Sequence, residues 1–441
     1  MKTKQTLSRR QALKLLAFGA AGTVLAACGG SPAPAGGPAA NQPAAGSGSG
    51  KLEIFSWWTS GGEVEALNAL YDIYKKKYPG VEIVNAALAG GAGAGGNMKA
   101  VLKTRMLGGD PPDSFQVHLG HELIDSHVVP GRMEPLDELF ASEGWNDVFP
   151  KQLTEIASSQ GKPYSVPVNI HRSNVLWYHK GLFSQAGVDK PPATWDEFFV
   201  AADKLKAKNI AALAIAENGP GFTGHVFENI LLSTLGPDTY RGLFNGKTKW
   251  DDAKVTESLN TLKKALDYAN PNYLSVSWGD VNDLIVAGKV AMMIMGDWTH
   301  GLLKSKNFND YGWAPAPGTS GVFMALSDSF GLPKGAKDRD NVLNWLKICG
   351  SREGQDAFNP LKGSISARTD ADLSKYDEYQ KGAIDDFKTN QITPSIVHGA
   401  AAKESFITDY VNVLNVMATK KNADEVQTKL VQAATDANFA A

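Results

Sequence analysis

Three histidines and an acid lie close together in the segment HLGHELIDSH, which contains His118, His121, Glu122 and His127. Imidazole and carboxylate groups at this spacing could bind a metal ion, and a helical H-E-x-x-H pattern would indicate a zinc site. The pattern breaks at Asp125, which stands where the second histidine is required. We therefore predict no metal site here, and we expect His118, at the end of a predicted strand, to form hydrogen bonds.

A second motif, GAGAGG at residues 91–96, matches the G-x-G-x-x-G pattern of dinucleotide-binding loops. The pattern alone is weak, because the segment GGDPPDSF follows the next helix and the chain begins with an export signal. We expect instead a glycine-rich loop that lets the backbone approach a small ligand, and we predict no cofactor. The sequence also contains no G-x-S-x-G elbow and no P-loop.

Two further groups could take part in reactions. Glu63 and Asp328 could form the carboxylate pair of an exported glycosidase. Carboxylates also bind sugar hydroxyls without any reaction, so the sequence leaves this alternative open. Cys349 lies in the apolar helical pattern NWLKICGS, which predicts a buried thiol rather than a nucleophile.

Four tryptophans lie next to glycines, polar residues and turns rather than inside apolar runs. They are Trp57, Trp58, Trp278 and Trp298, whereas Trp345 lies in the apolar pattern VLNWLKI of a core helix. A flat indole suits the C–H face of a pyranose, and a binding site of this kind is concave with few polar groups that fix orientation. Together these tryptophans favour a ligand site.

The first fifty residues predict export and anchoring. Residues 1–27 have a basic start with Arg9 and Arg10 as a twin-arginine pair, an apolar run too short to span a membrane, and a small-residue end. The segment LAAC resembles a lipobox, so we expect cleavage before Cys28 and lipidation of its thiol. Residues 28–50 are rich in Gly, Pro, Ala and Ser and predict a flexible linker. We expect a protein anchored by lipid to the outer face of the cytoplasmic membrane, at the cell surface or in the periplasm.

From Leu52 the chain alternates between strand and helix patterns, as in LEIFSWW, GEVEALNALYDIYKKKYP, VEIVNAAL, NMKAVLKTRMLGG and DSFQVHLG. This order predicts a largely parallel sheet with helices on its faces. Ligands bind such sheets at the carboxyl ends of the strands, where residues 57–63, 90–96 and 116–118 lie. A length of 441 residues predicts two lobes, and no clustered basic stripe suggests nucleic acid as a partner.

The segments IFSWW, KTRMLGGDPPDSFQVH, VPVNIHRSN, MGDW, SDSFGLPKGA, NPLKGSI and VHGA occur in this order. Through these segments and their order, residues 51–430 closely resemble the glucose/galactose-type sugar-binding proteins of bacterial ABC importers. The resemblance implies an α/β, two-lobed type II periplasmic-binding fold in which hinge strands join two sheets flanked by helices. It implies an N-terminal lobe of residues 51–168 and 327–365 and a C-terminal lobe of residues 169–326 and 366–441. Hinge crossings are implied near residues 167–169, 326–328 and 364–366.

The resemblance also implies the ligand and its contacts. The ligand would be a monosaccharide, with glucose, galactose or mannose preferred, and the partners would be a membrane permease and its cytosolic ATPase. The protein itself would be a monomer without enzymatic activity; a scaffold or adhesion lipoprotein is the remaining alternative. The residues that match the family's sugar contacts are Trp57, Trp58, Glu63, Gln116, His118, Trp278, Trp298, Asp328, Lys362 and His398, with Asn169 and His171 as further candidates. Trp57 or Trp58, with Trp278 or Trp298 opposite, would stack on the ring, and the polar groups would bind its hydroxyls.

Overall fold

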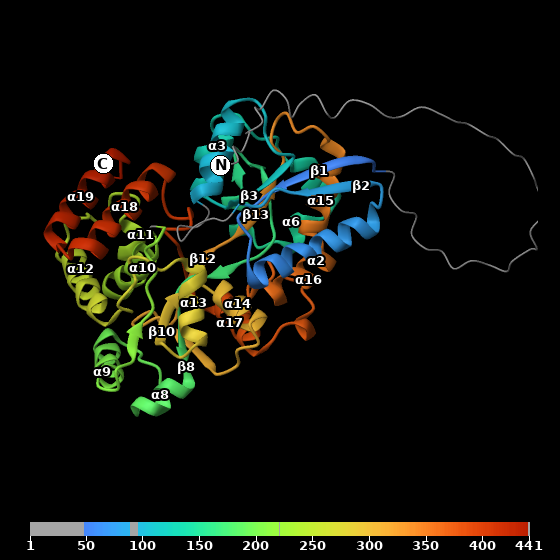
Figure 1. The fold of residues 1–441 in the computed structure, drawn as a ribbon. Helices are drawn as coiled ribbons and strands as arrows, with labels where there is room; N and C mark the ends of the chain where they lie inside the picture. Colours follow the sequence, from blue (N-terminus) through green and yellow to red (C-terminus); the bar gives the residue numbers. More distant parts are fainter. Residues whose placement is uncertain (1–47, 89–95, 220, 440–441) are drawn as a thin grey trace, which may run out of the picture. The chain divides into compact units, whose positions relative to one another are not determined.

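The computed structural model describes residues 48–88, 96–219 and 221–439 (Figure 1). The predicted export signal, Cys28, most of the predicted linker and the first five residues of the GAGAGG motif lie outside these ranges. Among the described helices, none combines the length and the apolar character needed to cross a bilayer.

The first sheet has five strands in the order β2-β1-β3-β13-β6. Strand β1 (Gly50–Phe55) pairs in parallel with β2 (Val81–Asn85) and with β3 (Ser114–His118). Helices α2 (Gly61–Lys77) and α3 (Gly96–Leu107) connect these strands, so the predicted alternation of strands and helices is confirmed. Strands β13 (Asp328–Gly331) and β6 (Ser165–Pro167) complete the sheet in antiparallel pairing, which the local pattern did not predict.

Helix α2 shows how the sequence positions this sheet. The helix ends at Lys77, just before Pro79, as the proline predicts, because a proline disfavours the helical conformation in the residue before it. Its buried face contains Leu67, Leu70, Tyr71 and Tyr74, whereas Val64 and Ile73, which the helical apolar pattern also places on this face, are only half buried. The apolar stripe is therefore rotated slightly from the one expected.

The second sheet has four strands in the order β11-β8-β10-β9, with bounds β8 (Val175–His179), β9 (Ala211–Leu213), β10 (Val290–Met295) and β11 (Tyr311–Pro315). Every residue of β10 is buried, as its run of apolar side chains predicts. The helices that follow in this part of the chain are α9 (Trp195–Lys206), α10 (Phe222–Leu235), α12 (Ala253–Ala265), α13 (Trp278–Val286) and α14 (Trp298–Ser305).

A third sheet, with the order β14-β12-β7, lies where the chain passes between the other two. Strand β12 (Val322–Leu326) is followed after one residue by β13 of the first sheet, and β6 of the first sheet is followed after three residues by β7 (His171–Arg172). Strand β14 (Gln391–Pro394) lies in a part of the chain whose sequence otherwise shows helical patterns, and the sequence did not indicate it. The strand was missed because four residues ending in proline give no periodic signal of their own.

The remaining elements are α4 (His121–Leu123), η1 (Ile124–Val128), α5 (Asp137–Ser142), α6 (Trp145–Val148), α7 (Lys151–Ile156), β4 (Ser158–Ser159), β5 (Lys162–Pro163), α8 (Lys180–Ala186), α11 (Pro237–Gly242), η2 (Leu266–Tyr268), α15 (Arg339–Gly350), α16 (Arg352–Lys362), η3 (Leu373–Lys375), α17 (Glu378–Thr389), α18 (Glu404–Lys420) and α19 (Ala423–Asp436). Cys349 in α15 is free and fully buried, and burial raises the pKa of its thiol, so the prediction of an inert core thiol is confirmed.

Candidate binding site

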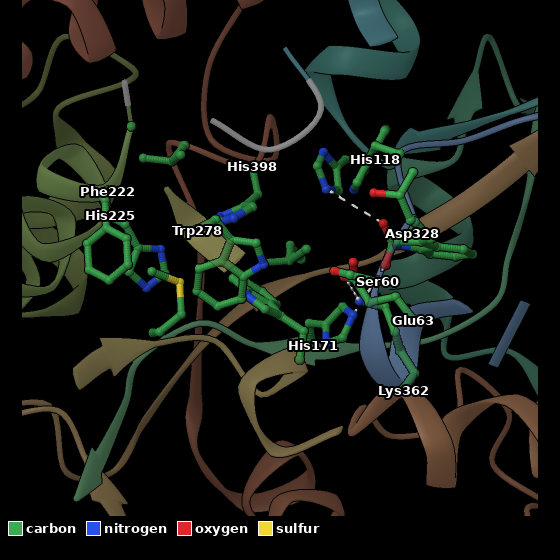
Figure 2. Close-up of a pocket in the computed structure, with 18 of the residues that line it drawn as sticks. Ser60, Glu63, His118, His171, Phe222, His225, Trp278, Asp328, Lys362 and His398 are labelled. Carbon is green, nitrogen blue, oxygen red and sulfur yellow. Dashed lines mark hydrogen bonds and ion pairs between the residues drawn. The ribbon is translucent and has the colours of Figure 1, made fainter. Parts of the chain in front are cut away.

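A pocket of about 290 Å³ lies at the carboxyl end of β1 and β3, where the sequence predicted a ligand site. Its lining joins residues that are far apart in the chain, from Trp57 to His398. Figure 2 shows His118, Glu63, Asp328 and Lys362 on one side of the pocket and Phe222, His225 and Trp278 on the other.

The structure brings the predicted residues together. All of the ten predicted ligand contacts except Gln116 line the pocket, and so does the further candidate His171. Gln116 lies directly behind the lining, where its side-chain amide donates to Asp328 Oδ1 at 2.8 Å and its carbonyl oxygen accepts from the backbone N–H of Trp57 at 3.1 Å. Gln116 therefore orients two lining residues.

The two adjacent tryptophans have different roles. Trp58 is 1% exposed and packs against Phe330 and Phe358, with ring centroids 5.8 and 5.1 Å away. Trp57 is half buried, and its ring lies 4.9 Å from that of His118 and 5.5 Å from the ammonium group of Lys99. Successive residues leave the end of β1 in different directions, so Trp57 presents the more accessible indole while Trp58 belongs mainly to the core.

Asp328, the first residue of β13, is the centre of a buried hydrogen-bond network. Its Oδ2 accepts from the Asn169 side-chain amide at 2.9 Å and lies 3.2 Å from Nε2 of His171. Burial opposes ionisation of Asp328, but the hydrogen bond from His171 and the positive charge of Lys362 outweigh it and hold the pKa of this carboxyl well below its usual range. Asp328 is therefore a carboxylate at neutral pH.

His171 pairs with two carboxylates. Its Nδ1 contacts Asp297 and its Nε2 faces Asp328. Burial alone would lower the pKa of His171, but the charge of Asp297 and the two hydrogen bonds raise it above the usual value. An imidazole between two carboxylates donates from both nitrogens, so His171 is the cationic partner that keeps Asp328 ionised.

Buried Lys362 and half-buried Glu63 form the second ion pair at the pocket, with Nζ and Oε1 2.7 Å apart. Lys362 is the last residue of α16 and Glu63 lies in the first turn of α2, the helix positions at which a cation and an anion are stabilised by the helix dipole. The Lys362 ammonium also lies 5.4 Å from the Trp58 ring and 5.9 Å from the Trp298 ring. We call Glu63, His171, Asp328 and Lys362 the charged side of the pocket.

The opposite side contains neutral groups. His398 lies 4.9 Å from the Trp298 ring and 5.4 Å from the His225 ring. Burial lowers the pKa of His225 to about 3, and burial together with the nearby His225 and His118 lowers the pKa of His398 well below its usual value. We call His225, Trp278 and His398 the neutral side of the pocket.

Sequence reasoning missed several lining residues, notably Phe222, His225, Ser277 and Met295. His225 lies in α10, a helix that is buried almost throughout, and no turn or strand end marks it. The one sequence feature that could have indicated His225 is its position close to Glu228 and Asn229 in an otherwise apolar helix. Such buried polar residues need partners, so they indicate a site or a network.

His225, Glu228 and His398 bring three groups of metal-binding types within 4.8 Å of one another. In this structure hydrogen bonds within the protein already engage the Glu228 carboxylate, which accepts the backbone N–H groups of Ile396 and Val397 at 2.6 and 3.1 Å. The HLGHELIDSH segment is also hydrogen-bonded: His118 pairs with Glu122 at 2.7 Å, and His121 pairs with Asp125 at 2.8 Å.

A glycosidase needs one carboxyl group that donates a proton, with a raised pKa. Asp328 has the opposite property, and Glu63 is paired with Lys362. The arrangement therefore fits recognition of hydroxyl groups better than acid catalysis.

The fold and the pocket define a two-lobed periplasmic solute-binding protein. Solved structures with this fold include the bacterial solute receptor AcbH, which prefers β-D-galactopyranose exclusively, with a TM-score of 0.76, 18% identity, and coverage of 88% of this chain and 98% of that one. A chitin oligosaccharide binding protein matches with a TM-score of 0.77 and 20% identity, over 88% and 99% of the two chains.

The family model of the bacterial extracellular solute-binding proteins matches residues 58–356, and the chain belongs to this family. An ABC transporter extracellular-binding protein of Pyrococcus horikoshii is 35% identical over 97% of this chain and 96% of its own length. A probable sugar-binding periplasmic protein of Mesorhizobium japonicum is 31% identical over 88% and 94%.

Proposed function

We propose that this protein captures a monosaccharide in the pocket and delivers it to the permease of an ABC importer, with glucose, galactose or mannose as the preferred ligand. The observation that most favours this function is the combination of accessible indoles with buried, ionised hydrogen-bonding groups in one small pocket. Indoles stack on the C–H face of a pyranose, and charged groups form the stronger hydrogen bonds to hydroxyls.

The size of the pocket supports a monosaccharide over a longer sugar. A volume of about 290 Å³ lies at the lower end of the range for small-molecule sites. The Mesorhizobium relative is called sugar-binding, and the receptor AcbH prefers a single galactopyranose. The likeness to a chitin oligosaccharide binding protein means that the fold also accommodates larger ligands, so pocket size is the property that argues for one ring.

The proposed mechanism is closure of two lobes over the sugar. The proposed lobes are residues 51–168 with 327–365 and residues 169–326 with 366–441. Their boundaries are supported by the changes of sheet between β6 and β7 and between β12 and β13. A sugar that contacts both lobes stabilises the closed state relative to the open one. We further propose that Cys28 is lipidated, so that a monomer remains near its permease at the outer face of the membrane.

A thermal-shift screen of the full-length protein with hexoses, pentoses and disaccharides tests the function, since a ligand that binds the folded state raises the melting temperature. We expect a concentration-dependent rise with at least one of glucose, galactose and mannose and a smaller rise with disaccharides. The absence of any shift would favour a scaffold protein. Overnight incubation with glycosides and chromatography of the products tests the glycosidase alternative, for which we expect no turnover.

A further inference from the structure

Glu228 lies behind the neutral side of the pocket and is fully buried in α10. It connects three segments that are distant in the sequence, because Ser173 follows β7 and the loop of residues 395–398 follows β14. Glu228 Oε1 lies 3.2 Å from the Ser173 hydroxyl and 2.9 Å from the Ser395 hydroxyl. The loop that Glu228 anchors is the one that positions His398 in the pocket.

The direction of these hydrogen bonds follows from the groups that can only donate. The backbone N–H groups of Ile396 and Val397 both point at Glu228 Oε2, so this oxygen can only accept. The Ser395 hydroxyl has a single proton, and its nearest anionic acceptor is the Glu228 carboxylate, which is ionised above about pH 7. Once that proton points at the carboxylate, the Ser395 oxygen acts as an acceptor toward His398.

His398 Nδ1 lies 2.8 Å from the Ser395 oxygen. A hydrogen bond at this distance then requires the proton to be on Nδ1. Burial and the neighbouring His225 and His118 keep His398 from gaining a second proton, so its Nε2 is unprotonated. The ring lies between His225 and His118, and it contributes to the pocket lining (Figure 2).

We propose that Glu228, acting through the Ser395 hydroxyl, is a positioning residue that fixes His398 as a hydrogen-bond acceptor toward the ligand. The ligand group against His398 must then be a hydroxyl that donates. The charged side differs in this respect, because it offers a cationic donor, Lys362, together with the carboxylate acceptors Glu63 and Asp328. The tautomer of His398 does not depend on which ligand binds, whereas the hydrogen bond from a sugar hydroxyl rests on the proposed function.

His225 suggests a substitution that reverses this polarity. Its Nε2 donates to the backbone carbonyl of Ser173 at 3.1 Å, so its Nδ1 is an acceptor, and this atom lies 3.4 Å from Glu228 Oε1 without a hydrogen-bond partner among the described residues. In Glu228→Gln the carbonyl oxygen would stay with the two backbone N–H groups. The new NH₂ group would then donate to His225 and to Ser395. The Ser395 proton would turn to His398 Nδ1, and His398 would become protonated on Nε2.

Long-range ¹H–¹⁵N NMR spectra of the full-length protein with ¹⁵N-labelled histidine test the tautomer without any ligand. The spectra are recorded at pH 8.5, because burial raises the pKa of Glu228 to about 7 and the carboxylate must be ionised. We expect His398 to be protonated on Nδ1 in the wild type and on Nε2 in Glu228→Gln. Ser395→Ala, which keeps Glu228, should shift His398 away from the Nδ1–H form.

The matched control is Asp356→Asn, which changes another buried carboxyl that accepts a backbone N–H, from Asp372, but lies outside the pocket lining. This control should leave the His398 signals as in the wild type. A wild-type His398 protonated on Nε2, or a His398 tautomer unchanged in both Glu228→Gln and Ser395→Ala, would overturn the proposal. A change of the wild-type spectrum on addition of EDTA would also overturn it, since a bound cation would then occupy the cluster.

The ligand arm uses D-glucose, D-galactose and their monofluoro-deoxy analogues in titration calorimetry. Fluorine cannot donate a hydrogen bond, so at one ring position the analogue should bind the wild type about tenfold or more weakly than the parent sugar. In Glu228→Gln the ratio of the dissociation constant of the analogue to that of the parent sugar should fall toward one at that position. The corresponding ratios at the other ring positions should persist. Equal ratios in both proteins would overturn the proposal that a ligand hydroxyl donates to His398. If neither sugar binds, the proposed function fails and the NMR result still decides the tautomer.

Discussion

The charged side and the neutral side of the pocket use the same kinds of residue in opposite electrostatic states. His171 and Asp328 are both buried and form an ion pair, whereas His225 and Glu228 are equally buried and 3.4 Å apart at their nearest atoms. The first histidine has a raised pKa and the second a pKa of about 3. The two acids also differ: the pKa of Asp328 is lowered, which favours its charged form, and that of Glu228 is raised to about 7, which favours its neutral form.

Neighbouring groups explain the difference. Burial disfavours every charge, so each group would be neutral without partners. On the charged side Asp297 and Lys362 supply opposite charges, and the pairs become stable as ions. On the neutral side His225 donates to a backbone carbonyl instead, and no lysine or arginine is among the causes of the Glu228 shift. A ligand therefore meets charged donors and acceptors on one side and weaker, neutral groups on the other.

The largest expected effect comes from Asp328→Asn on the charged side. The substitution keeps the shape but removes the anion between His171 and Lys362, so sugar binding should weaken by about 100-fold or more. Calorimetry checks the affinity, and circular dichroism checks that the protein is still folded. An affinity within a factor of three of the wild type in a folded variant would show that the charged side does not contact the ligand.

A smaller effect is expected when a single indole of the pocket lining is removed. Trp57→Ala and Trp278→Ala should each weaken binding about 10- to 100-fold, because each ring lines the pocket. The adjacent Trp58→Ala is the core control and should lower the free energy of unfolding by about 3–5 kcal/mol. Urea denaturation measures this difference. The reverse pattern, with Trp57→Ala unstable and Trp58→Ala stable but unable to bind, would exchange the roles assigned to the two rings.

The smallest effect is a pH dependence of opposite sign at two buried carboxyls behind the pocket lining, Glu122 and Glu228. Glu122 belongs to the network of His118: burial would raise its pKa, but Lys99 and His118 lower it to about 2. Its contribution to stability is therefore present above pH 4.5 and is lost as the pH falls toward 2. The pKa of Glu228 is about 7, so the folded state retains that proton. Its contribution is complete below pH 4.5 and declines as the pH rises toward 7.

Unfolding free energies of the wild type and Glu228→Gln at pH 4.5, 7 and 8.5 measure the second effect. The titratable groups near Glu228 are His225, His398, Tyr240 and Tyr410, which stay neutral because burial lowers the pKa values of the histidines and raises those of the tyrosines. Relative to the variant, the wild type should lose on the order of 3 kcal/mol between pH 4.5 and 8.5. A constant difference would mean that Glu228 does not change its proton in this range.

The charged side could be predicted from the sequence to a large extent. Asp328 and His118 lie at strand ends, and Trp57 and Trp58 follow the first strand, so local patterns and the family resemblance both indicated them. The assignment of Trp58 mainly to the core needed the structure, because the sequence does not show that Phe330 and Phe358 pack against it.

The sequence indicated Trp278 and His398 of the neutral side, but not His225 or the residues that support this side from behind. Glu228 and Val397 are 169 residues apart, and nothing in either local pattern predicts that α10 anchors the loop after β14. That loop follows a strand that the sequence did not reveal either. His398 was predicted as a contact, but its protonation state depends on Ser395 and Glu228, which are visible only once the chain is folded.

Titration calorimetry of the full-length protein with D-glucose and D-galactose, alongside Asp328→Asn, tests the central claim most directly. We expect saturable one-to-one binding of at least one of these sugars to the wild type and its loss, or a weakening of about 100-fold, in the folded variant. No heat with either sugar in the wild type, or undiminished binding in the variant, would contradict a monosaccharide site at this pocket.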